Sequence, residues 1–207
     1  MSLTTWFAFA AASIVLLLIP GPTVVLVVSY ALSQGRRVAL ATVAGVALGD
    51  FTAMSLSLAG LGALLATSAG LFTILKWAGA AYLVYLGVRL WRARPELPDL
   101  SADAPPRPVG GIFGHAFVVT ALNPKSIAFF VAFVPQFIDH AAPILPQLAI
   151  MLVTFVTLGA LNALAYAIAA DLLRVRVRRP EVIKWINRAG AGCLVSMGVA
   201  TAAISRN

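Results

Sequence analysis

Charged side chains are scarce in this sequence. They make up 11% of the 207 residues, and 61% of the residues are hydrophobic, whereas a soluble chain carries about 25% charged residues. So little polar surface cannot cover a globule of this length in water. Apolar runs near or above the ~18 residues of a membrane-spanning helix recur along the chain. The composition therefore excludes a large water-soluble domain and predicts an integral membrane protein.

Cysteine and histidine are nearly missing as well. Cysteine occurs once, at Cys193, and the two histidines, His115 and His140, lack the spacing of metal ligands. A disulfide or a cysteine-bound metal needs at least two cysteines, and the chain contains no phosphate-binding Walker sequence. We therefore expect no metal and no cofactor. Without a nucleophile and a base paired at one depth, an enzyme is not expected either.

Six apolar segments are long enough to cross a bilayer. Helices are expected because lipid cannot satisfy free backbone groups, and the ~10-residue alternation of outer-membrane strands is missing. We interpret the first segment as a retained helix and not as a signal peptide, since no basic residue precedes it. The predicted spans are 4–33, 39–66, 70–91, 112–137, 145–172 and 184–204.

The basic residues predict the orientation of these spans. A formal net charge of +8 would suggest nucleic acid if it lay on one soluble face, but here it is divided among short connections. Only the first, third and fifth connections carry basic residues, which predicts that they are cytoplasmic and that both termini face outward. These residues are Arg36, Arg37, Arg89, Arg92, Arg94, Arg107, Arg174, Arg176, Arg178, Arg179 and Lys184.

The two halves of the chain resemble each other. Residues 79–88 and 190–199 are identical at six of ten positions. Val46–Gly49 corresponds to Val156–Gly159 in the same order along the chain. A repeat of three spans has odd parity, so the second copy must be inverted, as in many secondary transporters. We predict an all-α membrane protein of six transmembrane helices in one transporter domain: repeat one at 1–91, a proline-rich linker at 92–111 and repeat two at 112–207.

Two of the predicted spans contain sequences that break helices. Pro20-Gly21-Pro22 lies near the middle of span 1, and a proline lacks the N–H group and clashes with the carbonyl four residues back. The inner half of a broken span 1 would present free N–H groups and a positive dipole end to a cavity, which suits a carboxylate. A tolerated kink is the alternative. Asn123-Pro124 predicts a second break in span 4.

Two charged residues lie deep within these spans. At ~1.5 Å per residue, Lys125 is about 20 Å and Asp50 about 17 Å from the start of its span. A lone charge at the centre of a bilayer costs from about 3 to more than 10 kcal/mol. We therefore predict that Asp50 and Lys125 share a midplane pocket beside the two breaks. A purely structural ion pair is one alternative, and a lysine that reaches the interface is another.

Two pairs of residues stand four positions apart on the predicted spans. Gly49 and Gly45 are four residues apart, which predicts a face that packs closely against another helix. Asn162 and Tyr166 lie one turn apart on span 5. They would either line the same pocket or form hydrogen bonds across helices.

In their order and spacing, these sequences resemble the LysE/RhtB family of bacterial amino-acid exporters over essentially the whole chain. The third connection looks shorter than in the lysine-exporter branch, which favours the threonine/homoserine-type branch. The matching stretches are Pro20-Gly21-Pro22, Gln34-Gly35-Arg36-Arg37, and residues 45–50, 75–83, 122–125, 129–133 and 135–137.

The resemblance implies efflux of amino acids or related metabolites across the bacterial inner membrane, driven by the proton motive force. It carries the presumed substrate site onto Pro20, Gly21, Pro22, Gly49, Asp50, Asn123, Pro124 and Lys125.

Our hypothesis is alternating access around this site. The substrate carboxylate would meet the broken span 1 and Lys125, while the substrate ammonium and a proton would compete for Asp50. A passive small-solute channel, a membrane interaction partner and an exporter of metal cations remain as alternatives. The sequence determines neither the substrate nor the oligomeric state, and it leaves a homo-oligomer open.

Overall fold

Every described element of the chain is helical. The computed structural model describes residues 1–34, 38–93, 108–139, 141–176 and 180–203, and these ranges contain no strand. The elements are α1 (Leu3–Leu18), α2 (Pro22–Gln34), α3 (Ala39–Thr67), α4 (Ala69–Arg92), α5 (Val109–Ala121), α6 (Pro124–Ala128), the π-helix η2 (Phe129–Phe133), the 3₁₀-helix η3 (Val134–Phe137), α7 (Ile144–Arg176) and α8 (Pro180–Ala203).

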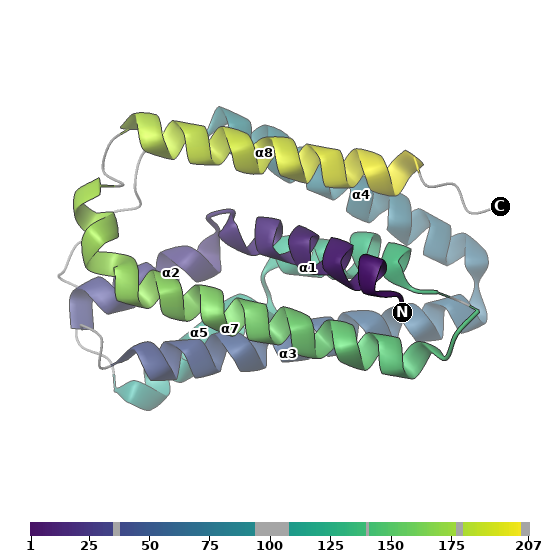
Figure 1. The fold of residues 1–207 in the computed structure, drawn as a ribbon, viewed down its shortest axis with the longest axis horizontal. Helices are drawn as coiled ribbons and strands as arrows, with labels where there is room; N and C mark the ends of the chain where they lie inside the picture. Colours follow the sequence, from purple (N-terminus) through teal and green to yellow (C-terminus); the bar gives the residue numbers. More distant parts are fainter. Residues whose placement is uncertain (35–37, 94–107, 140, 177–179, 204–207) are drawn as a thin grey trace.

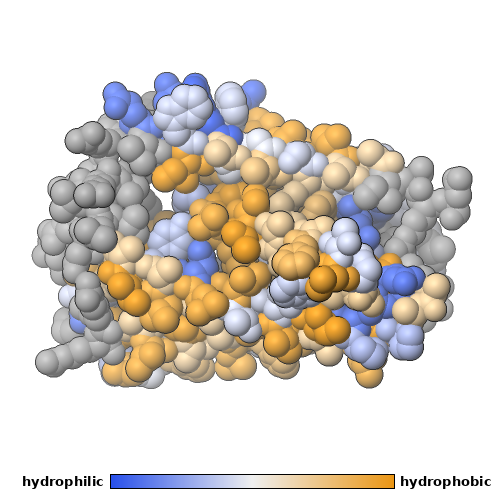
Figure 2. All heavy atoms as spheres, viewed as in Figure 1, coloured by the Kyte–Doolittle hydropathy of each residue, from blue (hydrophilic) through white to orange (hydrophobic). Residues whose placement is uncertain are grey.

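Several of these helices are suited to a bilayer. By length and composition, Ala39–Gly62, Val109–Phe137 and Ile144–Ala170 can each cross a membrane. The bent pair Leu3–Leu18 and Pro22–Gln34 makes a fourth crossing if it counts as one broken span. Large hydrophobic side chains point outward, among them Leu40 (77% exposed) and Leu145 (79% exposed), and hydrophobic spheres dominate the middle of the face in Figure 2. Six crossings remain a prediction.

The helices form two groups with the broken first segment between them (Figure 1). α4 and α8 pack along each other, while α3 packs against α5 and α7. α1 contacts both α7 and α8, so its interruption lies in the interior of the bundle. The start of α1 and the end of α8 point to the same end of the molecule in Figure 1. Most of the basic side chains that predict the orientation lie outside the described residues, so the orientation also remains a prediction.

The first predicted break is present. α1 ends at Leu18 and α2 begins at Pro22, and the two helices are bent by 57°. The first bond of α2 runs from the Val25 N–H to the Gly21 carbonyl at 3.0 Å. A bend of this size separates two helix ends, whereas a tolerated kink would keep one continuous helix. The kink alternative is therefore wrong.

The second predicted break is present too, and it has a different form. α5 ends at Ala121, and Asn123 caps α6 by accepting a hydrogen bond from the Lys125 N–H at 3.1 Å. Pro124 occupies the first turn, where a helix needs no N–H donor. The helix then widens to the π-form at 129–133, where the Val134 N–H donates to the Phe129 carbonyl. Pro135 follows directly and cannot continue regular α-helical hydrogen bonding.

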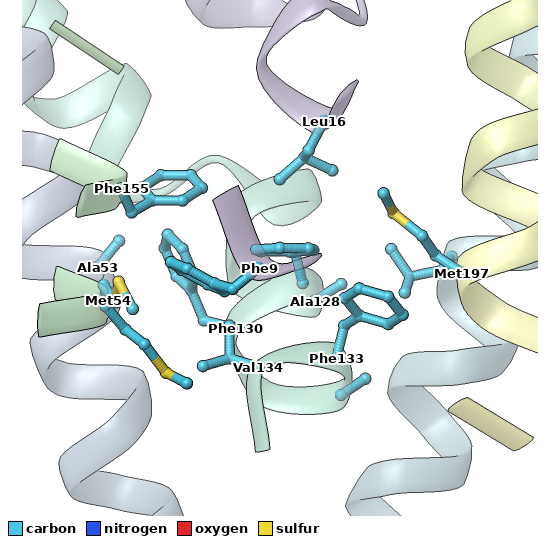
Figure 3. Close-up of a cluster of buried hydrophobic side chains, with 14 of the residues drawn as sticks. Phe9, Leu16, Ala53, Met54, Ala128, Phe130, Phe133, Val134, Phe155 and Met197 are labelled. Atoms are coloured by element: carbon cyan, nitrogen blue, oxygen red, sulfur yellow. The ribbon is translucent and has the colours of Figure 1, made fainter. Parts of the chain in front are cut away.

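A cluster of buried apolar side chains, which we call the aromatic cluster, joins α1, α3, η2, α7 and α8 in the interior of the bundle (Figure 3). Phe9, Phe129, Phe130 and Phe155 are fully buried there, with ring centroids 4.7 to 6.5 Å apart. Met54, one turn after Asp50 on α3, belongs to the same cluster. The cluster therefore lies next to the predicted pocket, on the side of the two chain termini.

Glycines set the closest helix contacts. A Cβ added to Gly45 would lie 2.5 Å from the Phe113 carbonyl, and one added to Gly49 would lie 2.7 Å from the Thr120 Cβ. Neither position leaves room for a side chain, so α3 and α5 approach each other directly. The predicted close-packing face is confirmed.

The contact between α4 and α8 is reciprocal. A Cβ on Gly87 would lie 2.7 Å from the Val195 Cγ2 and 2.9 Å from the Ala191 carbonyl. A Cβ on Gly198 would lie 2.7 Å from both the Val84 Cγ2 and the Ala80 carbonyl. These are the same positions exchanged between residues 79–88 and 190–199. Such an exchange is the signature of a two-fold contact.

Candidate functional site

A small cavity of about 30 Å³ lies where the two breaks meet α3 and α7. Its volume leaves room for roughly one or two water molecules. Six of the predicted site residues line it, together with Thr23, Ser126 and Gly159, which the prediction left out. These six are Gly21, Asp50, Asn123, Lys125, Asn162 and Tyr166.

Four carbonyl oxygens at the end of α1, those of residues 16–19, accept hydrogen bonds from side chains of other helices. The Leu16 oxygen also accepts the Ile19 N–H at 3.2 Å. Lys125 Nζ donates to the carbonyl oxygens of Leu16 and Ile19, at 2.8 Å each. Asn162 Nδ2 donates to the Leu17 carbonyl and the Tyr166 hydroxyl to the Leu18 carbonyl, at 3.2 Å each. A helix end leaves its last carbonyls unpaired and carries a partial negative charge, which favours a cation. We call these four oxygens the α1 carbonyl cluster.

Asp50 supplies the negative charge of the cavity. Its side chain is 2% exposed, and a Cβ on Gly159 would lie 2.5 Å from its Oδ2. Lys125 lines the same cavity, but no direct ion pair between the two is found among the described residues. The structural ion pair that we kept as an alternative is therefore not formed in this state. Asp50 faces the cavity without a hydrogen-bond partner in the described part of the chain.

A second group of hydrogen bonds ties the two breaks together. Asn123 Nδ2 donates to Thr23 Oγ1 at 3.2 Å, and Thr23 Oγ1 lies 3.3 Å from Thr120 Oγ1. The prediction did not include Thr23. The available signal was its position, because it follows directly after Pro20-Gly21-Pro22.

The start of α2 faces the same cavity. Thr23 and Val24 occupy its first turn and line the space, and N–H groups in a first turn have no intrahelical acceptor. The break in the first span therefore presents both poles of a helix within one site: carbonyl oxygens from α1 and N–H groups from α2. A zwitterion has the matching pair of charges.

A larger crevice of about 300 Å³ lies on the other side of the breaks. Pro20, Pro22 and Pro124 line it, so the remaining prolines of the predicted site face this space. Arg89, at the end of α4, lines it as well, although the sequence suggested only a role in orientation. Gly21, Asn123 and Lys125 line both the crevice and the cavity. These three residues therefore separate a space of amino-acid size from the buried polar cavity.

Gly49 is the one predicted site residue that lines neither space. It faces α5, where Thr120 and the Phe117 carbonyl leave no room for a side chain. Its role in the structure is packing, and it supports the site by bringing α3, and with it Asp50, close to α5.

Comparisons with known proteins identify the family of this chain. Residues 14–204 match the family described as LysE type translocator. The homoserine/homoserine lactone efflux protein of Salmonella typhimurium is 35% identical over 198 residues, which cover 96% of each chain. An uncharacterized membrane protein of Vibrio cholerae is 34% identical over 199 residues, covering 96% of this chain and 97% of that protein.

A third relative covers less of the chain. The leucine efflux protein of Salmonella typhimurium is 34% identical over 138 residues, which are 67% of this chain and 65% of that protein. No solved structure matches this chain. The near-complete match to the homoserine protein confirms the resemblance to the threonine/homoserine-type branch. On these matches, the chain belongs to the LysE type translocator family and is a membrane transport protein, not an enzyme.

Proposed function

We propose that this protein is a secondary active exporter of amino acids or closely related metabolites in the bacterial inner membrane, and that export is coupled to proton entry. The observation that carries the proposal is the broken first span, whose two helix poles meet Asp50 and Lys125 in one buried cavity. Charges at this depth are rare in membrane proteins and are usually functional.

The substrate class follows from the chemistry of the site. The first-turn N–H groups of α2 suit a carboxylate, while the α1 carbonyl cluster and Asp50 suit an ammonium group. The relatives named for homoserine, homoserine lactone and leucine efflux support this choice. All three of these solutes carry a primary ammonium group, but the lactone has no free carboxylate. The ammonium group is therefore the feature that the site must recognise in each case.

Proton coupling is assigned to Asp50. Its carboxylate binds either the substrate ammonium or a proton. Protonation from outside therefore releases the substrate, and the transporter then returns to the state that faces the cytoplasm. One proton crossing ~150 mV supplies about 3.5 kcal/mol. At ~1.4 kcal/mol per tenfold ratio, this sustains a gradient of a few hundredfold.

Alternating access by two inverted three-helix repeats would explain why the site is covered on one side and adjoins a crevice on the other. The aromatic cluster closes the side of the chain termini, and the crevice lies on the side where α4 ends. With the predicted orientation, this state is closed to the outside and receives substrate from the cytoplasm. The reciprocal contact of Gly87 and Gly198 supports the repeat. Prolines 20, 22 and 124 act as the hinges of the broken spans.

Reconstituted protein tests the function. Proteoliposomes loaded with homoserine, threonine, leucine or lysine should exchange at least one of them for external labelled substrate, and an imposed pH gradient should drive net accumulation. Flux that ignores the pH gradient would favour a passive channel. No flux for any solute would favour an interaction partner. The metal-cation alternative has no support within the described residues, where no three His, Cys, Asp or Glu side chains gather.

A further inference from the structure

The ammonium group of Lys125 occupies a place that suits a free ligand. It donates two hydrogen bonds of 2.8 Å to backbone oxygens of α1, more than 100 residues away in sequence. Short bonds from a charged donor are among the strongest hydrogen bonds in proteins. Asp50 lines the same cavity without a hydrogen-bond partner of its own in the described residues.

A lysine side chain ends in the same group that every amino acid carries on its α-carbon. Both are primary ammonium ions with three N–H donors and one positive charge. The carbonyl oxygens that accept hydrogen bonds from Lys125 Nζ can therefore accept the same bonds from a substrate ammonium group.

We propose that the α1 carbonyl cluster is the binding site for the substrate's ammonium group and that Lys125 is its tethered occupant when no substrate is bound. This inference rests on the proposed function and assigns the site's chemistry more closely. Arriving substrate displaces Lys125 Nζ from the carbonyls of Leu16 and Ile19. The released ammonium group of Lys125 then meets the substrate carboxylate, where there is one.

The position of Lys125 explains how substrate would reach the cluster. The buried cavity is too small for an amino acid, and the neighbouring crevice is large enough. Among the described residues, Lys125 is the only charged one that lines both spaces. Its displacement therefore joins the crevice to the cavity at the moment that substrate binds, and the empty cluster is never left without a cation.

Methylammonium tests this inference because it is a primary ammonium ion without the rest of an amino acid. Purified Lys125→Ala should bind methylammonium, measured as saturable thermal stabilisation and by calorimetry. Wild-type protein should bind it at least about tenfold more weakly, a difference of ~1.4 kcal/mol, because methylammonium must first displace Lys125 Nζ from its two acceptors. Tetramethylammonium has the same charge but no N–H donor, and it should not stabilise the variant.

The Asp50 charge gives a second comparison. Asp50→Asn in the Lys125→Ala background should weaken methylammonium binding, while Lys125→Gln, whose amide can still donate to the carbonyls, should bind it little better than wild type. Equal responses of wild type and Lys125→Ala, or equal effects of the two cations, would overturn the inference.

The stability of the Lys125→Ala variant tests the inference as well. If the vacant cluster prevents Lys125→Ala from folding, methylammonium but not tetramethylammonium should restore monodisperse protein during solubilisation and purification. Failure to restore it would show that Lys125 is a structural cap only. Since none of these measurements requires transport, binding without export would uphold the ammonium site and reject the proposed function.

Discussion

Gly159 places α7 directly against the carboxylate of Asp50. A Cβ at this position would lie 2.5 Å from Asp50 Oδ2, closer than any unbonded carbon and oxygen can approach. We expect Gly159→Ala to move Asp50 and to lower transport by about tenfold, which corresponds to ~1.4 kcal/mol. Transport assays in proteoliposomes check this. Gly60→Ala is the matched control, because a Cβ there meets nothing within 4 Å, and it should transport at the wild-type rate.

Thr23 holds the two breaks together through its hydroxyl group. Thr23→Val keeps the shape but leaves Asn123 and Thr120 without this partner, which should cost about 1–3 kcal/mol. Thermal unfolding in detergent should show a lower midpoint, and the KM for substrate should rise. Thr52→Val is the control, since the Thr52 hydroxyl only donates to its own helix, at the Leu48 carbonyl. Equal effects of the two substitutions would contradict this role.

The sequence predicted which residues form the site better than it predicted which groups they contact. Asp50 and Lys125 were recognisable because no helix of a bilayer protein tolerates a charge at mid-depth without a reason. In the structure, both residues line the same cavity. The sequence did not predict that Lys125 Nζ donates to the carbonyl oxygens of Leu16 and Ile19. A long, flexible side chain selects its partner only in the folded protein, so spacing along a helix does not determine it.

At the scale of elements, α4 and α8 give the clearest test of internal symmetry. Gly87→Ala and Gly198→Ala would each force a methyl group into the facing helix, and overpacking of this kind costs about 1–3 kcal/mol. If the two positions are equivalent, the substitutions should lower thermal stability by similar amounts. Gly192→Ala, with open space around it, should be neutral. A large loss for only one of the pair would contradict the reciprocal contact.

The helix breaks were predictable, and their consequences were only partly so. Proline chemistry places the ends of α1 and α5 within a few residues of where the structure has them. The π-helix at 129–133 was not predicted, although Pro135 stands just after it. Phe129, Phe130 and Phe133 of this π-helix pack in the aromatic cluster, against helices that are distant in sequence.

At the scale of the whole molecule, two groups of helices surround one interrupted segment, and the site lies at the interruption. The aromatic cluster packs beside this site, and the crevice adjoins it at Gly21, Asn123 and Lys125. The lengths of the apolar runs and the positions of the basic residues predicted six spans and their orientation. Among the described residues, three helices are long and apolar enough to cross, or four if the bent pair α1 and α2 is one span. Length and composition alone do not identify a crossing in a segment that is broken or carries charges.

The central claim is that Asp50 and Lys125 act together in one buried site to couple proton entry to solute export. Proton-driven uptake of a labelled substrate into everted vesicles measures this coupling directly, with wild type, Asp50→Asn and Lys125→Ala compared at equal amounts of inserted protein. We expect Asp50→Asn to lose accumulation driven by the proton gradient and Lys125→Ala to lose at least about 90% of the rate, a tenfold change worth ~1.4 kcal/mol. Accumulation at the wild-type rate in either correctly inserted variant would contradict the account.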